Sequence, residues 1–374
     1  MKDNPLDLIK VNCAPLKKHM TAARGYQGIP GIELTPNGRL WATWYSGGVT
    51  EGPENFALLV TSPDNGKTWS EPVAVVDPPG NVRAYDPAIW RDPAGRFWWS
   101  WAQSYGTFDG RAGVWAAFTE TPESPHPSFS EPVRIANGVM MNKPTFLANG
   151  EWALPTAVWE YCIPRPEELK DERFSNMTVS ADKGKTFQLR GGANIPHRCY
   201  DEHMIVELND RRLWMLVRTL YGIGQSFSPD MGKTWTPGEN SKLGGPNSRF
   251  FIRRLSSGNL LLVNHADISE AEAVGQFVNG STWRKRSHLT AFVSDDDGHT
   301  WKGGLLLDER EGVSYPDGTE DKHGVIRIIY DWERYKEGVI LMATFREQDV
   351  LAGKQVSKEF KLKSLVNKTG GVKK

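Results

Sequence analysis

The sequence of 374 residues predicts an all-β fold, a six-bladed β-propeller, from one repeated motif and from the spacing of the strand patterns around it. The motif has the form Ser-x-Asp-x-Gly-x-Thr-Trp/Phe, and it occurs at residues 62–69, 180–187, 228–235 and 294–301. These residue types suit a hairpin connection, because aspartate accepts hydrogen bonds from the backbone N–H groups that follow it and glycine adopts positive φ without steric cost. A degenerate copy lies in the widest gap between the motifs, because residues 129–133 repeat the pattern of residues 69–73.

The prediction of six blades rests on six opening strands, one for each blade. They are predicted at residues 26–34, 85–90, 142–146, 201–206, 247–252 and 314–317. Most of these openings are followed by a turn and a second apolar strand, as at Pro36-Asn37-Gly38 before residues 39–45. We expect one domain over residues 1–374, in which an amino-terminal strand within residues 6–16 completes the last blade. The carboxy-terminal tail from about residue 354 is rich in Lys, Ser and Gly, and we expect it to be loosely held.

Two stretches exceed the repeat. Residues 161–174 contain Pro164 and Pro166 and predict a loop with one helical turn. Residues 266–288 are longer and polar, and we expect a short helix from 269 to 276. Such insertions belong on the ligand-binding face by analogy with other propellers.

Composition narrows the classes of function. Lys plus Arg equals Asp plus Glu at 45 each, so no net field recruits nucleic acid or a membrane surface. The first five residues are too polar for a signal peptide, and no apolar run approaches a membrane-spanning length. We therefore expect a cytoplasmic chain, or a secreted or periplasmic one whose signal was removed. The three cysteines cannot build a disulfide framework, and no phosphate-binding loop, dinucleotide fingerprint or nucleophile elbow occurs. We therefore predict no cofactor and no metal, and leave the oligomeric state open.

Polar side chains at the blade openings indicate a site on the propeller axis. The first strand of each blade lines the central channel, so polar residues there converge. The openings offer ionisable or polar groups in strands otherwise rich in Ile, Phe and Val: Gln27, Asp86, Lys143, Glu202, Arg249 and Tyr315, with Arg218 at the end of the second strand of blade four.

The repeated motif is the Asp box, and with it the sequence resembles the sialidase (neuraminidase) superfamily, in which the box is a structural signature of the blade turns. The resemblance implies a tyrosine nucleophile with a glutamate base, three arginines that hold the substrate carboxylate, and an aspartate as acid/base. It assigns the nucleophile to Tyr315, the base to Glu202, and two of the arginines to Arg218 and Arg249. A free tyrosine has a pKa near 10, so a neighbouring carboxylate must take its proton before it attacks.

Two features depart from that family. Gly28 stands in Gln27-Gly28-Ile29-Pro30 where the family's first arginine is expected, and the substitutes open to the chain are Arg24, Lys143 and Arg83. The loop that should carry the acid/base aspartate holds only Glu51 and Glu54, so the role falls to one of these or to Asp86. The sequence therefore predicts an exo-acting glycoside hydrolase for a terminal acidic sugar, with weak activity on sialosides.

Other interpretations stay open. A propeller rhamnosidase or polysaccharide lyase would use a histidine such as His203 or His19 as acid/base, and a carbohydrate-binding propeller would need no catalytic pair. Four potential metal ligands alternate along one predicted strand: His197, Cys199, Asp201 and His203. Side chains so close together on one strand diverge rather than converge on an ion, so we do not predict a metal site there. Trp98, Trp99 and Trp101 suit the core between blades, whereas Trp159 and Trp283 suit stacking on a sugar.

Overall fold

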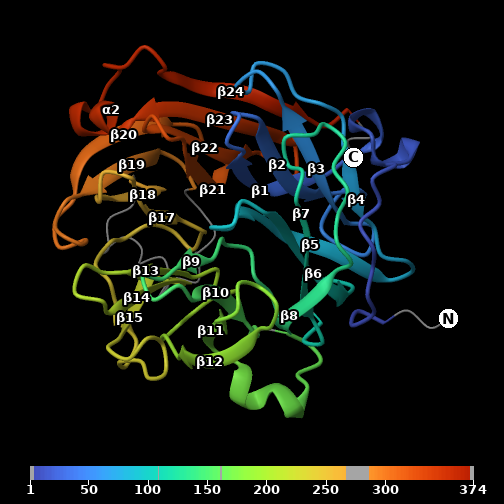
Figure 1. Cartoon of the computed structure of the whole chain (residues 1–374), viewed down its shortest axis with the longest axis horizontal. Coiled ribbons are helices and arrows are strands. Elements are labelled where there is room, and N and C mark those ends of the chain that lie inside the picture. The colour runs from blue at the N-terminus through green and yellow to red at the C-terminus, as the bar shows by residue number, and fades with distance from the viewer. Residues whose placement is uncertain (1–3, 108, 161, 267–285, 371–374) are drawn as a thin grey trace.

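The computed structural model describes residues 4–107, 109–160, 162–266 and 286–370, and it confirms an all-β propeller of six blades around a ring (Figure 1). Each blade is a four-stranded antiparallel sheet. The first three blades are β1 Gln27–Leu34, β2 Leu40–Ser46, β3 Phe56–Ser62 and β4 Ala74–Val76; β5 Val82–Arg91, β6 Phe97–Tyr105, β7 Gly113–Thr119 and β8 Val133–Asn137; and β9 Thr145–Phe146, β10 Trp152–Ala157, β11 Ser175–Ser180 and β12 Gln188–Ala193. The last three are β13 Met204–Glu207, β14 Leu213–Thr219, β15 Gly222–Ser228 and β16 Glu239–Asn240; β17 Phe251–Arg254, β18 Leu260–His265, β19 Leu289–Ser294 and β20 Lys302–Asp308; and β21 Val313–Glu320, β22 Val325–Trp332, β23 Val339–Arg346 and β24 Lys361–Lys368.

The Asp boxes form the turns that follow the third strands, as their residue types predict. In the first copy Asp64 Oδ1 accepts from the backbone N–H of Thr68 at 2.9 Å, and Thr68 Oγ1 donates to Asp64 Oδ2 at 2.7 Å. Gly66 N donates to Ser62 Oγ at 2.9 Å, and Gly66 has φ of +80°. The hydrogen bonds that Asp64 accepts, the backbone one from Thr68 first, lower the pKa of Asp64 to about 2.

The core lies between neighbouring blades and is rich in tryptophan. Trp98, Trp99 and Trp101 are buried, as predicted, and Trp99 Nε1 donates to Thr43 Oγ1 of the adjoining blade at 2.9 Å. Trp98 stacks on Trp90 with 5.9 Å between ring centroids and meets Trp152 of the next blade edge to face. Contacts of this kind hold one blade against the next without backbone pairing.

The two ends of the chain differ from the prediction. The amino-terminal segment does not complete the last blade, because its one backbone bridge joins Asn12 to Val75 in β4 of the first blade. The last blade is completed by its own fourth strand, β24, which pairs with β23. This strand lies inside the segment predicted to be a loose tail.

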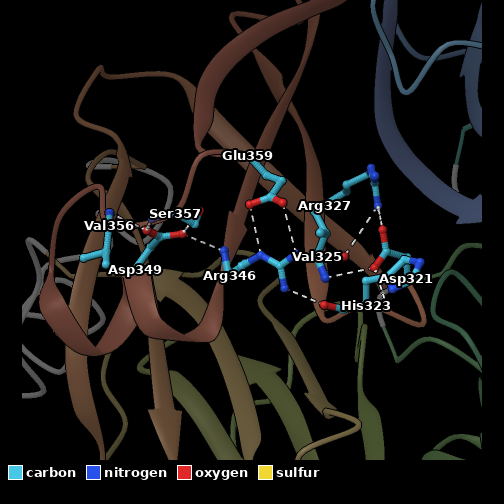
Figure 2. Close-up of polar contacts among 9 residues, drawn as sticks. All are labelled: Asp321, His323, Val325, Arg327, Arg346, Asp349, Val356, Ser357 and Glu359. Carbon is cyan, nitrogen blue, oxygen red and sulfur yellow. Dashed lines mark hydrogen bonds and ion pairs between the residues drawn. The ribbon is translucent and has the colours of Figure 1, made fainter.

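Side chains also fasten the start of that segment (Figure 2). Asp349, in the short helix α2 Glu347–Ala352, accepts from the backbone N–H groups of Val356 at 2.6 Å and Ser357 at 2.7 Å. Arg346 Nε pairs with Glu359 Oε2 at 3.0 Å. The segment from residue 354 is therefore bonded to blade six before β24 begins.

Of the two insertions, the first is a loop with the 3₁₀ turn Glu167–Glu172, as predicted. The helix predicted at 269–276 lies outside the described residues. Within the described ranges no helix combines the length and apolar character needed to cross a membrane.

Candidate active site

All six blades contribute residues to a cavity of about 520 Å³, which therefore lies on the axis of the ring. Five predicted candidates line it: Glu51, Asp86, Glu202, Arg218 and Tyr315. Arg83, one of the proposed substitutes for the missing arginine, lines it as well.

An unusual backbone conformation presents three of these side chains. Asp86, Glu202 and Tyr315 have φ of 46°, 44° and 57°, and Ile29 of blade one has φ of 60°. The register of the first strand shifts at Gly28/Gly31, Tyr85/Ala88 and Ser314/Asp317, so Ile29, Asp86 and Tyr315 sit at β-bulges. Left-handed φ costs about 1–3 kcal/mol at residues other than glycine, and such strain clusters at functional sites.

Tyr315, Glu202 and Arg218 form one hydrogen-bonded group. Tyr315 Oη donates to Glu202 Oε1 at 3.1 Å, and Arg218 Nη1 donates to Tyr315 Oη at 2.9 Å and to Glu202 Oε1. Arg218 Nε donates to Asn247 Oδ1 at 2.6 Å, which fixes the plane of the guanidinium. Glu202 Oε2 is buried and has no hydrogen-bond partner among the described residues, so this oxygen can still accept a hydrogen bond.

Two further arginines enter the cavity from connections between strands, and the sequence prediction missed both. The guanidinium carbon of Arg334 lies 4.4 Å from the centroid of the Tyr315 ring, and that of Arg286 lies 5.3 Å from it. Arg286 Nη2 donates to Asn247 O at 2.8 Å. Arg334 lies two residues after the end of β22 and Arg286 closes the basic run 284–286, so each had a weak signal in the sequence.

Two other carboxyl groups that line the cavity, Asp86 and Glu51, differ in protonation. Burial raises the pKa of Asp86 to about 8; Arg83 opposes the rise, and the neighbouring Glu202 adds to it. Burial also acts on Glu51, but Arg334, Arg83 and two tyrosine hydroxyls outweigh it and lower the pKa of Glu51. Asp86 is therefore protonated at neutral pH and Glu51 is ionised.

Tyrosine side chains hold Glu51 in place. Glu51 Oε1 accepts from Tyr335 Oη at 2.7 Å and from Tyr26 Oη at 3.2 Å, and Glu51 Oε2 lies 3.8 Å from Arg83 Nη1. Glu54, the other glutamate of this loop, is exposed and does not line the cavity; it borders a different hollow.

Arg249 and Lys143 are drawn away from the cavity by other carboxylates. Arg249 Nη2 lies 3.5 Å from Asp317 Oδ1, and Arg249 Nη1 donates to Pro30 O. Lys143 Nζ lies 3.3 Å from Glu33 Oε2 and 3.4 Å from Asp317 Oδ2. The prediction that these two cations line the substrate cavity is not met, because they neutralise the buried acids Glu33 and Asp317.

Four other predicted residues also lie outside it: Gln27, Arg24, His203 and His19. Gln27 accepts from Arg24 Nη1 at 3.1 Å and donates to Gly338 O at 2.8 Å, so the two satisfy each other in the core. His203 is buried with Nε2 2.7 Å from Asn176 O, and His19 Nε2 lies 3.0 Å from Asp77 Oδ2 near the amino terminus. The described residues that line the cavity include no histidine.

Aromatic rings form one wall of the cavity. Trp159 packs edge to face on Tyr200 with 5.1 Å between centroids and lies 6.0 Å from Tyr85. Trp159 thus lines the cavity as the sequence suggested, although its side chain is mostly covered. Trp283 lies outside the described residues, and the described part of the chain shows no cluster of three or more metal-ligating side chains.

The fold and the cavity define the class, a six-bladed propeller with an axial pocket that joins a tyrosine, carboxyl groups and arginines. The family model of BNR repeat-like domains matches residues 36–328, so the chain belongs to that family, within the sialidase superfamily. A curated relative, a sialidase of Bacteroides fragilis (strain YCH46), is 25% identical over 319 residues, which cover 77% of this chain and 56% of the relative. The chain thus spans just over half the length of that relative.

Solved structures share the fold. The Hadza microbial sialidase Hz136 matches with a TM-score of 0.67 and 18% identity over 88% of this chain and 67% of that one. The intramolecular trans-sialidase from Ruminococcus gnavus, in complex with oseltamivir carboxylate, matches with a TM-score of 0.67 and 13% identity over 90% and 97% of the two chains. At such identities the likeness extends to the fold alone.

Proposed function

We propose that the protein is an exo-acting, retaining glycoside hydrolase that removes a terminal acidic sugar from a glycan, with Tyr315 as nucleophile and Glu202 as its base. The observation that carries the proposal is the 3.1 Å hydrogen bond from Tyr315 Oη to Glu202 Oε1 inside the axial cavity. A base must lie within hydrogen-bond reach of the proton that it takes, and this pair meets that condition.

In the first step Tyr315 Oη attacks the anomeric carbon while Glu202 takes the phenolic proton. Asp86, which is protonated at neutral pH, gives its proton to the oxygen of the leaving sugar as the glycosidic bond breaks. In the second step the Asp86 carboxylate takes a proton from water, which attacks the anomeric carbon and releases Tyr315, and Glu202 returns the phenolic proton. A tyrosine nucleophile is a known exception among glycosidases, which mostly use two carboxylates.

Three guanidinium groups supply the preference for an acid: Arg218, Arg286 and Arg334. Arginine forks match a carboxylate in two-point hydrogen bonds, and each charged hydrogen bond contributes about 1.5–3 kcal/mol. The sequence predicts an empty third corner beside Gly28 and hence weak activity on sialosides. Arg334 fills that corner, so we propose sialosides as the first candidates among acidic glycosides.

The test is a screen of purified protein against sialosides, uronic acid glycosides and rhamnosides, with product stereochemistry followed by NMR. We expect hydrolysis of an acidic glycoside with retention at the anomeric carbon. Hydrolysis of a neutral rhamnoside alone, or full activity of Tyr315→Phe on the best substrate, would refute the assignment.

A further inference from the structure

Gly28 leaves a space that the Arg334 side chain occupies. A Cβ atom at position 28 would lie 2.8 Å from Arg334 Cδ, 3.0 Å from Asp331 Oδ2 and 3.2 Å from Arg334 Cβ. The backbone of Gly28 does not have positive φ, so its conformation is open to any residue. The glycine is therefore needed for space and not for backbone freedom.

Asp331 connects this space to both neighbouring bulges. It is fully buried at the end of β22, and its Oδ2 accepts from the backbone N–H of Ile29 at 2.8 Å. Its Oδ1 accepts from Ser314 Oγ at 2.6 Å, next to Tyr315 in the chain. Arg334 Nη1 lies 3.6 Å from Asp331 Oδ2 and has no hydrogen bond to the described residues. One carboxylate thus ties blade one and the Tyr315 bulge together and attracts Arg334.

We propose that Gly28 and Asp331 are positioning residues that admit and aim Arg334, and that Arg334 is a specificity-determining residue that binds the acidic group of the substrate beside Tyr315. This inference rests on the proposed function. The side chain comes from the connection after β22 and not from β1, and it spreads over the ring face of Tyr315 at 4.4 Å. Arg334, which would bind the acid, and Tyr315, the proposed nucleophile, are then both positioned by blade six through Asp331.

The discriminating measurement is the ratio of kcat/KM for an acidic glycoside to that for its methyl ester, since esterification removes the charge and keeps the sugar. We expect Arg334→Ala to lower this ratio about 10- to 100-fold, the equivalent of one charged hydrogen bond or slightly more. Gly28→Ala should lower the ratio similarly, because the added methyl displaces the flexible Arg334 chain. The double variant should show no further loss, as for two residues that act through one group.

Gly31→Ala is the matched control. It lies on the same strand, and its Cβ would lie 3.2 Å from Thr43 Cγ2 and 3.3 Å from Asp317 Oδ2, away from Arg334. We expect it to keep the ratio of acid to ester whatever it does to stability. Asp331→Asn keeps the size and one acceptor oxygen for the Ile29 N–H, and its amide N–H can donate to Ser314 Oγ, but it loses the charge that attracts Arg334. We expect KM for the acid to rise while KM for the ester is unchanged.

A crystal structure of Gly28→Ala provides a readout that is independent of turnover, and we expect the Arg334 guanidinium to have left the Tyr315 ring. An unmoved Arg334 together with an unchanged ratio would overturn the inference while leaving the proposed function intact. If the wild-type protein hydrolyses no acidic glycoside, the proposed function fails. Calorimetric binding of free N-acetylneuraminic acid and glucuronic acid then decides the inference: wild-type binding that Gly28→Ala and Arg334→Ala weaken equally supports it, and absent or unaffected binding refutes it.

Discussion

Replacing Asp86 by asparagine should make the protein more stable at neutral pH while removing its activity. Burial raises the pKa of this carboxyl to about 8, compared with 3.8 for an unperturbed aspartate. Because the folded-state pKa lies above the unfolded one, the contribution of Asp86 to stability is greatest below about pH 4 and is lost as pH rises towards 8. Asparagine is neutral and nearly the same size, so it escapes this loss.

The magnitude follows from the shift. Each pH unit between 3.8 and 8 costs the wild-type protein about 1.4 kcal/mol relative to the asparagine variant. The stability difference should grow from about 2 kcal/mol at pH 5 to about 4 kcal/mol at pH 7, and level off above pH 8. No hydrogen bond to Asp86 occurs among the described residues, so the amide forfeits none there.

The assay is urea unfolding of both proteins between pH 5 and pH 9, with Asp64→Asn as control. The pKa of Asp64 is lowered to about 2, so the difference between the control and the wild type should stay constant over this range. Turnover by Asp86→Asn should fall about 10²- to 10⁴-fold, the usual contribution of a general acid. A stability difference that is independent of pH, or an asparagine variant less stable at pH 7, would refute the reasoning.

Four further predictions follow from the same contacts and pKa shifts. Wild-type kcat should fall as pH rises through about 8, because Asp86 loses the proton that it donates, and a profile still rising at pH 9 would exclude it as the acid. Tyr315→Phe should abolish turnover while calorimetry shows ligand binding nearly unchanged, and Glu202→Gln should lower kcat far more than it changes KM. In the third Asp box, Asp230→Ala should lower the melting temperature with kcat unchanged, because the hydrogen bonds of Asp230 to described residues all lie within its turn. A matching loss of kcat would contradict this.

The blade count could be predicted because its signals are local. An Asp box closes its own turn through Asp and Thr, and each opening strand is set off by turn residues, so neither depends on distant packing. The closure of the ring could not be predicted in this way. The strand Lys361–Lys368 carries three lysines and lies at the edge of its sheet, where charged side chains are typical, and such a strand looks like a solvated tail in sequence.

Two of the site residues could be predicted because their own strands present them. Asp86 and Tyr315 sit at bulges of opening strands, and the register of those strands fixes where they point. Arg334 reaches the cavity from a connection, through a space left by a glycine far away in the chain. Arg249 lies on a predicted opening but pairs with Asp317, a residue 68 positions later in the chain, and such a contact is set by the folded structure rather than by local sequence.

The different protonation states of the two buried carboxyl groups, Asp86 and Glu51, follow from their partners and not from how deeply they are buried. Both Asp86 and Glu51 lose solvation, which by itself favours the neutral form. Arg334 and Arg83, and then two tyrosine hydroxyls, compensate the burial of Glu51, so it stays charged and in turn disfavours a charge on Asp86. Arg334, proposed to bind the acid of the substrate, therefore also keeps Glu51 ionised. The charge on Glu51 in turn helps to keep Asp86, the proposed general acid, protonated.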